Sequence, residues 1–104
     1  MSENIFTNIP KPADKEFFEA LLIKDGLKIE RIVSYGHETP KHEWYDQKQN
    51  EWVILLKGEA IVSFLEEDEV RLGAGDYINI PAHKKHRVSW TKPNEESVWL
   101  TVHY

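Results

Sequence analysis

From residue 27 onward the sequence is a series of short segments rich in β-branched and aromatic residues, separated by glycine, proline and charged turns. Such segments, with a turn every few residues, are typical of an antiparallel sandwich or barrel, whereas parallel βαβ units would need helices between the strands. The pattern therefore predicts an all-β fold. The expected strands are 28–35, 51–56, 60–65, 70–72, 76–80, 86–91 and 98–104.

The amino-terminal part of the chain has a different pattern. Residues 1–12 are mostly polar and carry two prolines, which indicates an extended arm or an added strand rather than a helix. From Asp14 to Lys24 apolar residues recur with helical spacing, and an Asp-Gly pair follows as a stop signal. This predicts one short helix, so that residues 1–26 form an arm and a helix packed on a single barrel over residues 27–104.

Size and composition allow one compact domain. The chain has 104 residues, of which 40% are hydrophobic, and it has no cysteine, so no disulfide can supplement the core. The formal net charge of -5 disfavours nucleic acid as a partner. No apolar run approaches the ~20 residues of a membrane span, and the polar amino terminus has no signal region. We therefore expect a cytoplasmic protein with no membrane and no nucleic-acid partner.

The segment 52–56 is apolar on both of its strand faces. Such a strand must be covered on both sides of its sheet. The outer cover could be the predicted helix, the arm or a second subunit, and a homodimer is the expected assembly. Trp52 and Trp99 are expected on outer faces, packed under the helix or at the dimer interface.

Four of the five histidines fall in two pairs, His37 with His42 and His83 with His86. Because the chain has no thiolate, any metal ligands must be histidine, carboxylate or amide side chains. The polar flanks of His42 indicate an exposed loop, and we expect His37 and His103 to be structural or solvated. His83 follows Pro-Ala in a turn, where it is either a surface residue or a ligand.

Alternation along two strands places one imidazole and one carboxylate on apolar faces. His86 shares its face with Val88 and Trp90, and Glu51 shares its face with Val53. Inside a closed barrel these groups need a hydrogen-bond partner, a counter-charge or a metal ion. One inward His and one inward Glu, with one or two further ligands, suit iron, manganese, nickel or zinc.

Both residues also have a purely structural interpretation. The imidazole of His86 could simply hydrogen-bond inside the barrel, and the carboxylate of Glu51 could pair with Arg31 or Arg87. The residues alone leave these alternatives open.

The second half of the chain carries a recognisable spacing. Gly75, Pro81 and His86 stand in the order Gly, five residues, Pro, four residues, His, which resembles the second motif of the cupin family. His83 takes the place of the second glycine of that motif, and Trp90 takes the place of its asparagine. The resemblance is to small single-domain cupins of the conserved-barrel type.

The first cupin motif is only partly present. Glu51 and Gly58 match it, but its His-x-His pair is missing. Counting forward from Gly36 places the first histidine of the pair on His42. Counting back from the glutamate gives two alternatives, namely Trp44 with Asp46, or Tyr45 with Gln47.

The resemblance implies an antiparallel double-stranded β-helix, or jelly roll. It also implies one bound metal ion in many members, which use it for dioxygenation, isomerisation or hydrolysis, and a metal-free barrel in others. Carried over by position, the implied metal ligands are His86, Glu51, His83, Gln47 and Asp46. The implied cavity residues are Tyr45, Trp44, Trp90 and His42, of which the first two could instead close the end of the barrel.

The first functional hypothesis is therefore a cupin that binds one divalent ion and a small organic ligand, as an oxygenase or an isomerase. Lys84, Lys85 and Arg87 lie near the expected mouth of the barrel, so an anionic ligand is one option. The alternatives are a metal-free binding or sensing barrel and a structural homodimer without catalysis. The missing His-x-His pair is the feature that distinguishes the first hypothesis from the metal-free barrel: either other side chains of that segment complete the metal site, or none do.

Overall fold

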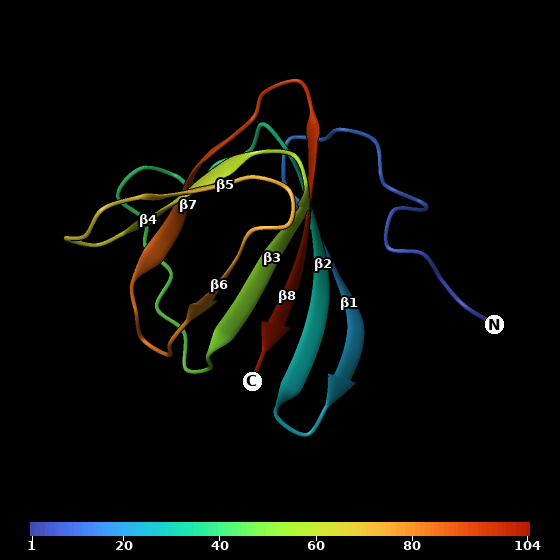
Figure 1. Ribbon diagram of the computed structural model, residues 1–104, viewed down its shortest axis with the longest axis horizontal. Coiled ribbons are helices and arrows are strands. Elements are labelled where there is room, and N and C mark those ends of the chain that lie inside the picture. The colour runs from blue at the N-terminus through green and yellow to red at the C-terminus, as the bar shows by residue number, and fades with distance from the viewer.

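The computed structural model describes residues 1–104 and contains eight strands and no helix (Figure 1). They form two antiparallel sheets, one of order β1-β2-β8-β3-β6 and one of order β5-β4-β7. The predicted all-β antiparallel fold is thus confirmed. The strands are β1 (Phe17–Lys24), β2 (Leu27–Tyr35), β3 (Glu51–Lys57), β4 (Ala60–Phe64), β5 (Val70–Leu72), β6 (Tyr77–Ile80), β7 (His86–Thr91) and β8 (Glu96–His103).

The predicted amino-terminal helix is wrong, because its residues form β1. This strand pairs antiparallel with β2, from Phe17 opposite Val33 to Lys24 opposite Leu27. The Asp-Gly pair that follows is a two-residue hairpin turn with Gly26 at a φ of 79°, a conformation that glycine adopts without strain. Pairing β1 with β2 satisfies backbone groups that β2 would otherwise leave open at the sheet edge. No helix long and apolar enough for a membrane crossing is present.

The hydrophobic core lies between the two sheets, which face each other in Figure 1. Inward side chains of β3 alternate with outward ones, so that Val53 and Leu55 are buried while Ile54 is only partly so. The same alternation in β4 buries Ala60 and Val62 from the opposite sheet. Seven buried side chains form the core cluster, namely Val53, Leu55, Ala60, Val62, Leu72, Ile80 and Trp99.

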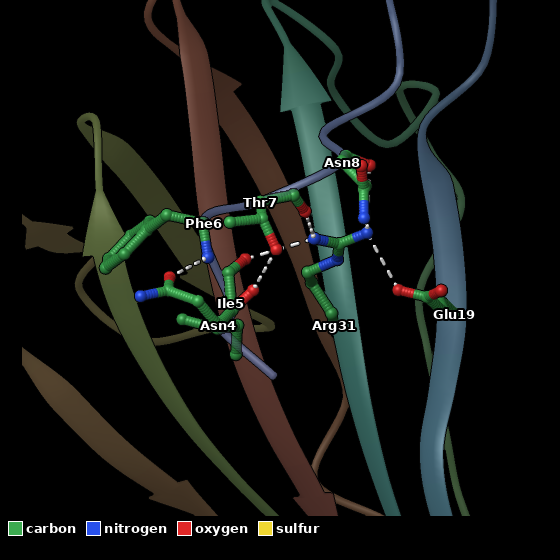
Figure 2. A network of polar contacts seen from close by, with 7 residues as sticks. All are labelled: Asn4, Ile5, Phe6, Thr7, Asn8, Glu19 and Arg31. Atoms are coloured by element: carbon green, nitrogen blue, oxygen red, sulfur yellow. Dashed lines mark hydrogen bonds and ion pairs between the residues drawn. The ribbon is translucent and has the colours of Figure 1, made fainter. Parts of the chain in front are cut away.

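The amino-terminal arm is fixed to the outer face of β2 by one buried guanidinium group (Figure 2). Arg31 Nη1 donates to the carbonyl oxygens of Ile5 and Thr7 at 3.0 and 2.8 Å. Its Nη2 lies 2.8 Å from a carboxylate oxygen of Glu19 on β1 and donates to the carbonyl oxygen of Asn8 at 3.4 Å. The arm is therefore one of the covers expected over the outer face of the large sheet.

Replacing Arg31 by Met is expected to lower the free energy of unfolding by about 2–3 kcal/mol, because it removes charge-assisted hydrogen bonds to the arm carbonyls. The arm should also become the first site of cleavage in limited proteolysis. Urea unfolding and mass mapping of the first cut measure both effects. Arg71→Met on β5 is the control, since Arg71 is exposed and lies over the ring of Trp90. Equal losses in the two variants would contradict the anchoring role.

Candidate functional site

A cavity of about 130 Å³ opens between the two sheets. Its walls are largely apolar and are formed by side chains of both sheets, including the edge strand β1. This volume is below the roughly 300–1,000 Å³ of sites for drug-sized ligands, which favours a ligand of few atoms. The polar residues that line it are Glu16, Glu30, Tyr45, Gln47, Glu51, His86, Thr101 and His103.

The first pair of ionisable groups in the cavity is Glu51 with His86. Glu51 begins β3 and His86 begins β7, so the pair joins the two sheets. His86 Nε2 lies 3.3 Å from Glu51 Oε1, and both residues are buried. Of the two arginines considered as partners for Glu51, Arg31 holds the arm and Arg87 donates to the carbonyl oxygen of Thr39 at 2.9 Å. The inward carboxylate is thus paired with the inward imidazole.

The surroundings of His86 raise its pKa above the ordinary value. Burial acts in the opposite direction, because it disfavours the charged imidazolium. The contact with Glu51, together with the hydrogen bond from His86 Nδ1 to the carbonyl oxygen of Lys84 at 2.9 Å, outweighs burial and gives a raised pKa. The site therefore stabilises the protonated form of His86 relative to an imidazole in water.

This raised pKa predicts how stability depends on pH. The interaction of His86 with Glu51 contributes fully below the unfolded pKa of about 6.5 and is lost as the pH rises through the higher folded pKa. Urea unfolding in chelator between about pH 6 and pH 9 should show this loss. The His86→Gln variant should not show this pH-dependent loss of stability. The His42→Gln variant, changed at an exposed loop position, should show it as the wild type does. An identical pH profile for wild type and His86→Gln would contradict the assignment.

A second carboxylate–imidazole pair lines the same cavity. His103 Nε2 on β8 lies 3.5 Å from Glu30 Oε1 on β2, and both side chains are about one-tenth exposed. Sequence reasoning missed this pair and left His103 as structural or solvated. Alternation groups His103 with Thr101 and Trp99 on one face of β8, but it does not show that this face is the inner one.

Trp99 corrects a second expectation from the sequence. It is buried to 4% exposure and lines the cavity, whereas an outer-face position was predicted. In the observed register Trp99 is opposite Leu55 on β3, so both face the core. Trp52 lies on the other face, with its ring 5.4 Å from that of Tyr77.

The segment that replaces the missing His-x-His pair is held against β7. Tyr45 N donates to the carbonyl oxygen of His86 at 2.8 Å, and His86 N donates back to Tyr45 at 3.2 Å. His83 N donates to the carbonyl oxygen of Gln47 at 2.8 Å. As a result, Tyr45 and Gln47 line the cavity, and burial together with the Glu16 carboxylate raises the pKa of the Tyr45 phenol.

Two of the proposed metal ligands lie outside the cavity and contact each other. His83 Nδ1 is 2.8 Å from Asp46 Oδ1, and the two side chains are 67% and 42% exposed. His83 has a φ of 64°, the left-handed region in which glycine is unstrained. This conformation fits the glycine that the cupin motif has there, and the exposed imidazole does not line the cavity.

Three of the proposed cavity residues also lie outside it. His42 is exposed in a loop and has a φ of 74°. The guanidinium carbon of Arg87 lies 5.9 Å from the ring centre of Trp44. The guanidinium carbon of Arg71 lies 5.4 Å from the ring centre of Trp90. Neither tryptophan is among the residues that line the cavity.

Comparison with known proteins identifies the family. The sequence profile of the cupin domain matches residues 31–103, which is most of the chain. The chain belongs to the cupin family. No protein of curated function matches it in sequence.

Two solved cupin-like structures show the range of similarity. A candidate mannose-6-phosphate isomerase from Ralstonia eutropha is 41% identical, with a TM-score of 0.95 over 99% of this chain and 96% of that one. A cupin superfamily protein from Desulfitobacterium hafniense is 21% identical, with a TM-score of 0.77 over 91% of this chain and 82% of that one. The second similarity concerns the fold alone.

The donor chemistry of this cupin cavity fits a divalent ion, although no three His, Asp or Glu side chains are grouped as a metal site. The buried Gln47 Oε1 has no hydrogen-bond partner, and the buried Glu51 Oε1 has only the 3.3 Å contact with His86 Nε2. An amide oxygen, a carboxylate and an imidazole are suitable donors for first-row divalent metals, and they leave positions open for a ligand.

Proposed function

We propose that this cupin binds a small hydroxylated carbonyl compound in its cavity and isomerises it by proton transfer, with one divalent metal ion. The observation that carries the proposal is the presence of two carboxylate–imidazole pairs, Glu51 with His86 and Glu30 with His103, in one small apolar cavity. The name of the Ralstonia relative at 41% identity supports the same reaction class.

The proposed reaction needs only groups that take and return protons. In an aldose–ketose isomerisation, one proton moves between adjacent carbons and one moves between the two oxygens they bear, so no oxidant or reductant is consumed. Carboxylates and imidazoles are the usual general acids and bases for such steps. The apolar walls exclude water from the reacting carbons, and this protects an enediol-like species.

His86, Glu51 and Gln47 would hold the metal ion. An iron, manganese, nickel or zinc ion in this position would polarise the carbonyl oxygen of the ligand. Because the pKa of His86 is raised, protons compete with the metal for its imidazole up to a higher pH, so metal affinity should increase with pH.

The test is deuterium incorporation during turnover. The protein is supplied with each candidate metal in D₂O, and dihydroxyacetone and glyceraldehyde are followed by proton NMR. Interconversion with deuterium on the reacting carbon is the expected result, and Glu51→Gln should abolish it. No interconversion with any of the four metals, or oxygen consumption in its place, would overturn the isomerase assignment.

A metal-free binding barrel is the second candidate. It is favoured by the missing His-x-His pair, since the residues of that segment that line the cavity are Tyr45 and Gln47. On this alternative, small polar ligands raise the melting temperature of metal-free protein, and metals do not.

We also propose that the chain is a homodimer joined through β1. This edge strand exposes the large apolar side chains Phe17, Phe18, Leu21, Leu22 and Ile23, a pattern that an unpartnered edge usually avoids. Antiparallel pairing of two β1 strands about Leu21 and Leu22 would place Glu19 of one copy opposite Lys24 of the other.

The dimer predicts a solution mass of twice the 12.2 kDa of the chain. Light scattering after size-exclusion chromatography measures this mass, and Leu22→Lys should shift it toward the monomer. Leu65→Lys, at an exposed position after β4, is the matched control and should leave the mass unchanged. A monomeric wild type over the accessible concentration range would refute the proposal.

A further inference from the structure

We infer that Glu30 and His103 bind the ligand as a second pair, and that the cavity takes an uncharged or cationic polar molecule and excludes phosphate esters and other anions. The inference rests on the proposed function to the extent that both place the ligand in this cavity. It adds a residue pair that the cupin motifs do not contain, and it specifies the charge of the ligand.

The two pairs form one continuous row across the cavity wall. Glu30 is on β2, and His103 on the neighbouring strand β8 contacts it at 3.5 Å. His103 is directly opposite Glu51 in the register of β8 and β3, so their side chains are neighbours on the inner face. Glu51 in turn contacts His86 of the other sheet. Carboxylates and imidazoles therefore alternate from β2 to β7.

The charges in the cavity are unsuited to an anion. Three carboxylates line it, those of Glu16, Glu30 and Glu51, and no lysine or arginine does. Even with both imidazoles protonated, the lining carries a net negative charge. An anion would therefore lose its hydration in a cavity whose side chains, taken together, repel it, and a phosphate dianion would lose the most.

No lysine or arginine lines the cavity, and those near it are engaged in contacts of their own except Lys85, which is exposed. Lys84 Nζ lies 3.3 Å from a carboxylate oxygen of Glu67 and over the ring of Phe64. Lys28 lies 3.4 Å from the second carboxylate oxygen of Glu30, but it is 41% exposed and does not line the cavity. Since Arg87 is bound to a backbone carbonyl, none of these cations is free to receive a phosphate group inside.

Hydroxyl and ammonium groups fit the same lining well. Carboxylates accept hydrogen bonds from such donors, and a bond of this kind is stronger than one between neutral groups. The apolar walls can contact the carbon atoms of the ligand, and the volume of about 130 Å³ limits it to a few heavy atoms. A three-carbon hydroxycarbonyl compound or a small amino alcohol has this chemistry, whereas its phosphate ester does not.

The indole resonance of Trp99 provides a direct readout of binding. Trp99 is the one tryptophan that lines the cavity, and the other three serve as internal references for the fold. Dihydroxyacetone, glycerol and ethanolamine are titrated into ¹⁵N-labelled protein, with and without metal, beside dihydroxyacetone phosphate and glycolate. We expect saturable shifts of the Trp99 cross-peak with an uncharged or cationic probe and none with the anions. Tighter binding of the phosphate ester, or no binding of any uncharged or cationic probe, would overturn the inference.

Variants test the second pair separately from the first. Glu30→Gln and His103→Gln should weaken binding of dihydroxyacetone about tenfold or more, because each removes one of the two side chains placed to hydrogen-bond with its hydroxyl groups. Glu38→Gln and His42→Gln, both at exposed positions outside the cavity, are the matched controls. Unchanged binding in the cavity variants, with the three reference indole peaks in place, would overturn the role of the pair. Failure of the deuterium experiment alone would reject the isomerase activity and leave this binding result standing.

Discussion

Gly58→Ala is expected to lower the free energy of unfolding by about 3–5 kcal/mol, which is a large share of the stability of a domain of this size. Gly58 follows β3 and has a φ of 98°, a conformation that side chains rarely adopt. A Cβ atom there would meet Ser97 Oγ and would lie 2.8 Å from Ser97 Cα. Because Ser97 is fully buried at the start of β8, its backbone cannot move away without disturbing the sheet.

Gly26→Ala is the matched control for this prediction. Gly26 also has a positive φ, of 79°, but a Cβ atom there would meet nothing within 4 Å. Its substitution should therefore cost only the conformational strain, about 1 kcal/mol. Urea unfolding followed by tryptophan fluorescence compares the two. Similar losses would show that close approach to Ser97 is not what requires glycine at position 58.

Glu51→Gln is expected to have the largest effect on function. The substitution keeps the size of the side chain but removes the negative charge that raises the pKa of His86 and that would bind the metal. We expect loss of bound metal and a fall in isomerase rate of about 100-fold or more. The fold should persist, because an amide can still hydrogen-bond with the imidazole.

The control for Glu51→Gln is Glu38→Gln, which removes an exposed carboxylate outside the cavity. Metal content and initial rate are measured on both variants under the same conditions. A Glu51→Gln protein that retains metal and more than about one-tenth of the wild-type rate would place the chemistry elsewhere.

The strands were predictable because their signals are local. Each of the seven strands expected after residue 27 lies within two residues of an observed one, since turn residues fix its ends. The error at β1 came from the Asp-Gly pair at residues 25–26, which ends a helix or turns a hairpin equally well in the sequence. Only pairing with β2 decides between these, and pairing is a property of the whole sheet.

The residues of the candidate site were predictable only where alternation within one strand was enough to place their side chains. Glu51 and His86 follow from alternation within β3 and β7, and both line the cavity. Trp99 and His103 were misplaced because their faces depend on how β8 is aligned with β3, which a single sequence does not show. The sequence does not distinguish Asp46 from Gln47 as a ligand, and Gln47 is the one that lines the cavity in the segment hydrogen-bonded to β7.

The central claim is that His86, Glu51 and Gln47 bind a divalent metal ion, and metal content is its most direct test. The protein is purified without an affinity tag or chelator, and its metals are quantified together with its melting temperature before and after EDTA treatment. We predict nearly one equivalent of metal per chain, a lower melting temperature in EDTA that iron, manganese, nickel or zinc restores, and no metal in a folded His86→Gln variant. Wild-type protein that contains no metal and whose melting temperature responds to none of the four would contradict the claim.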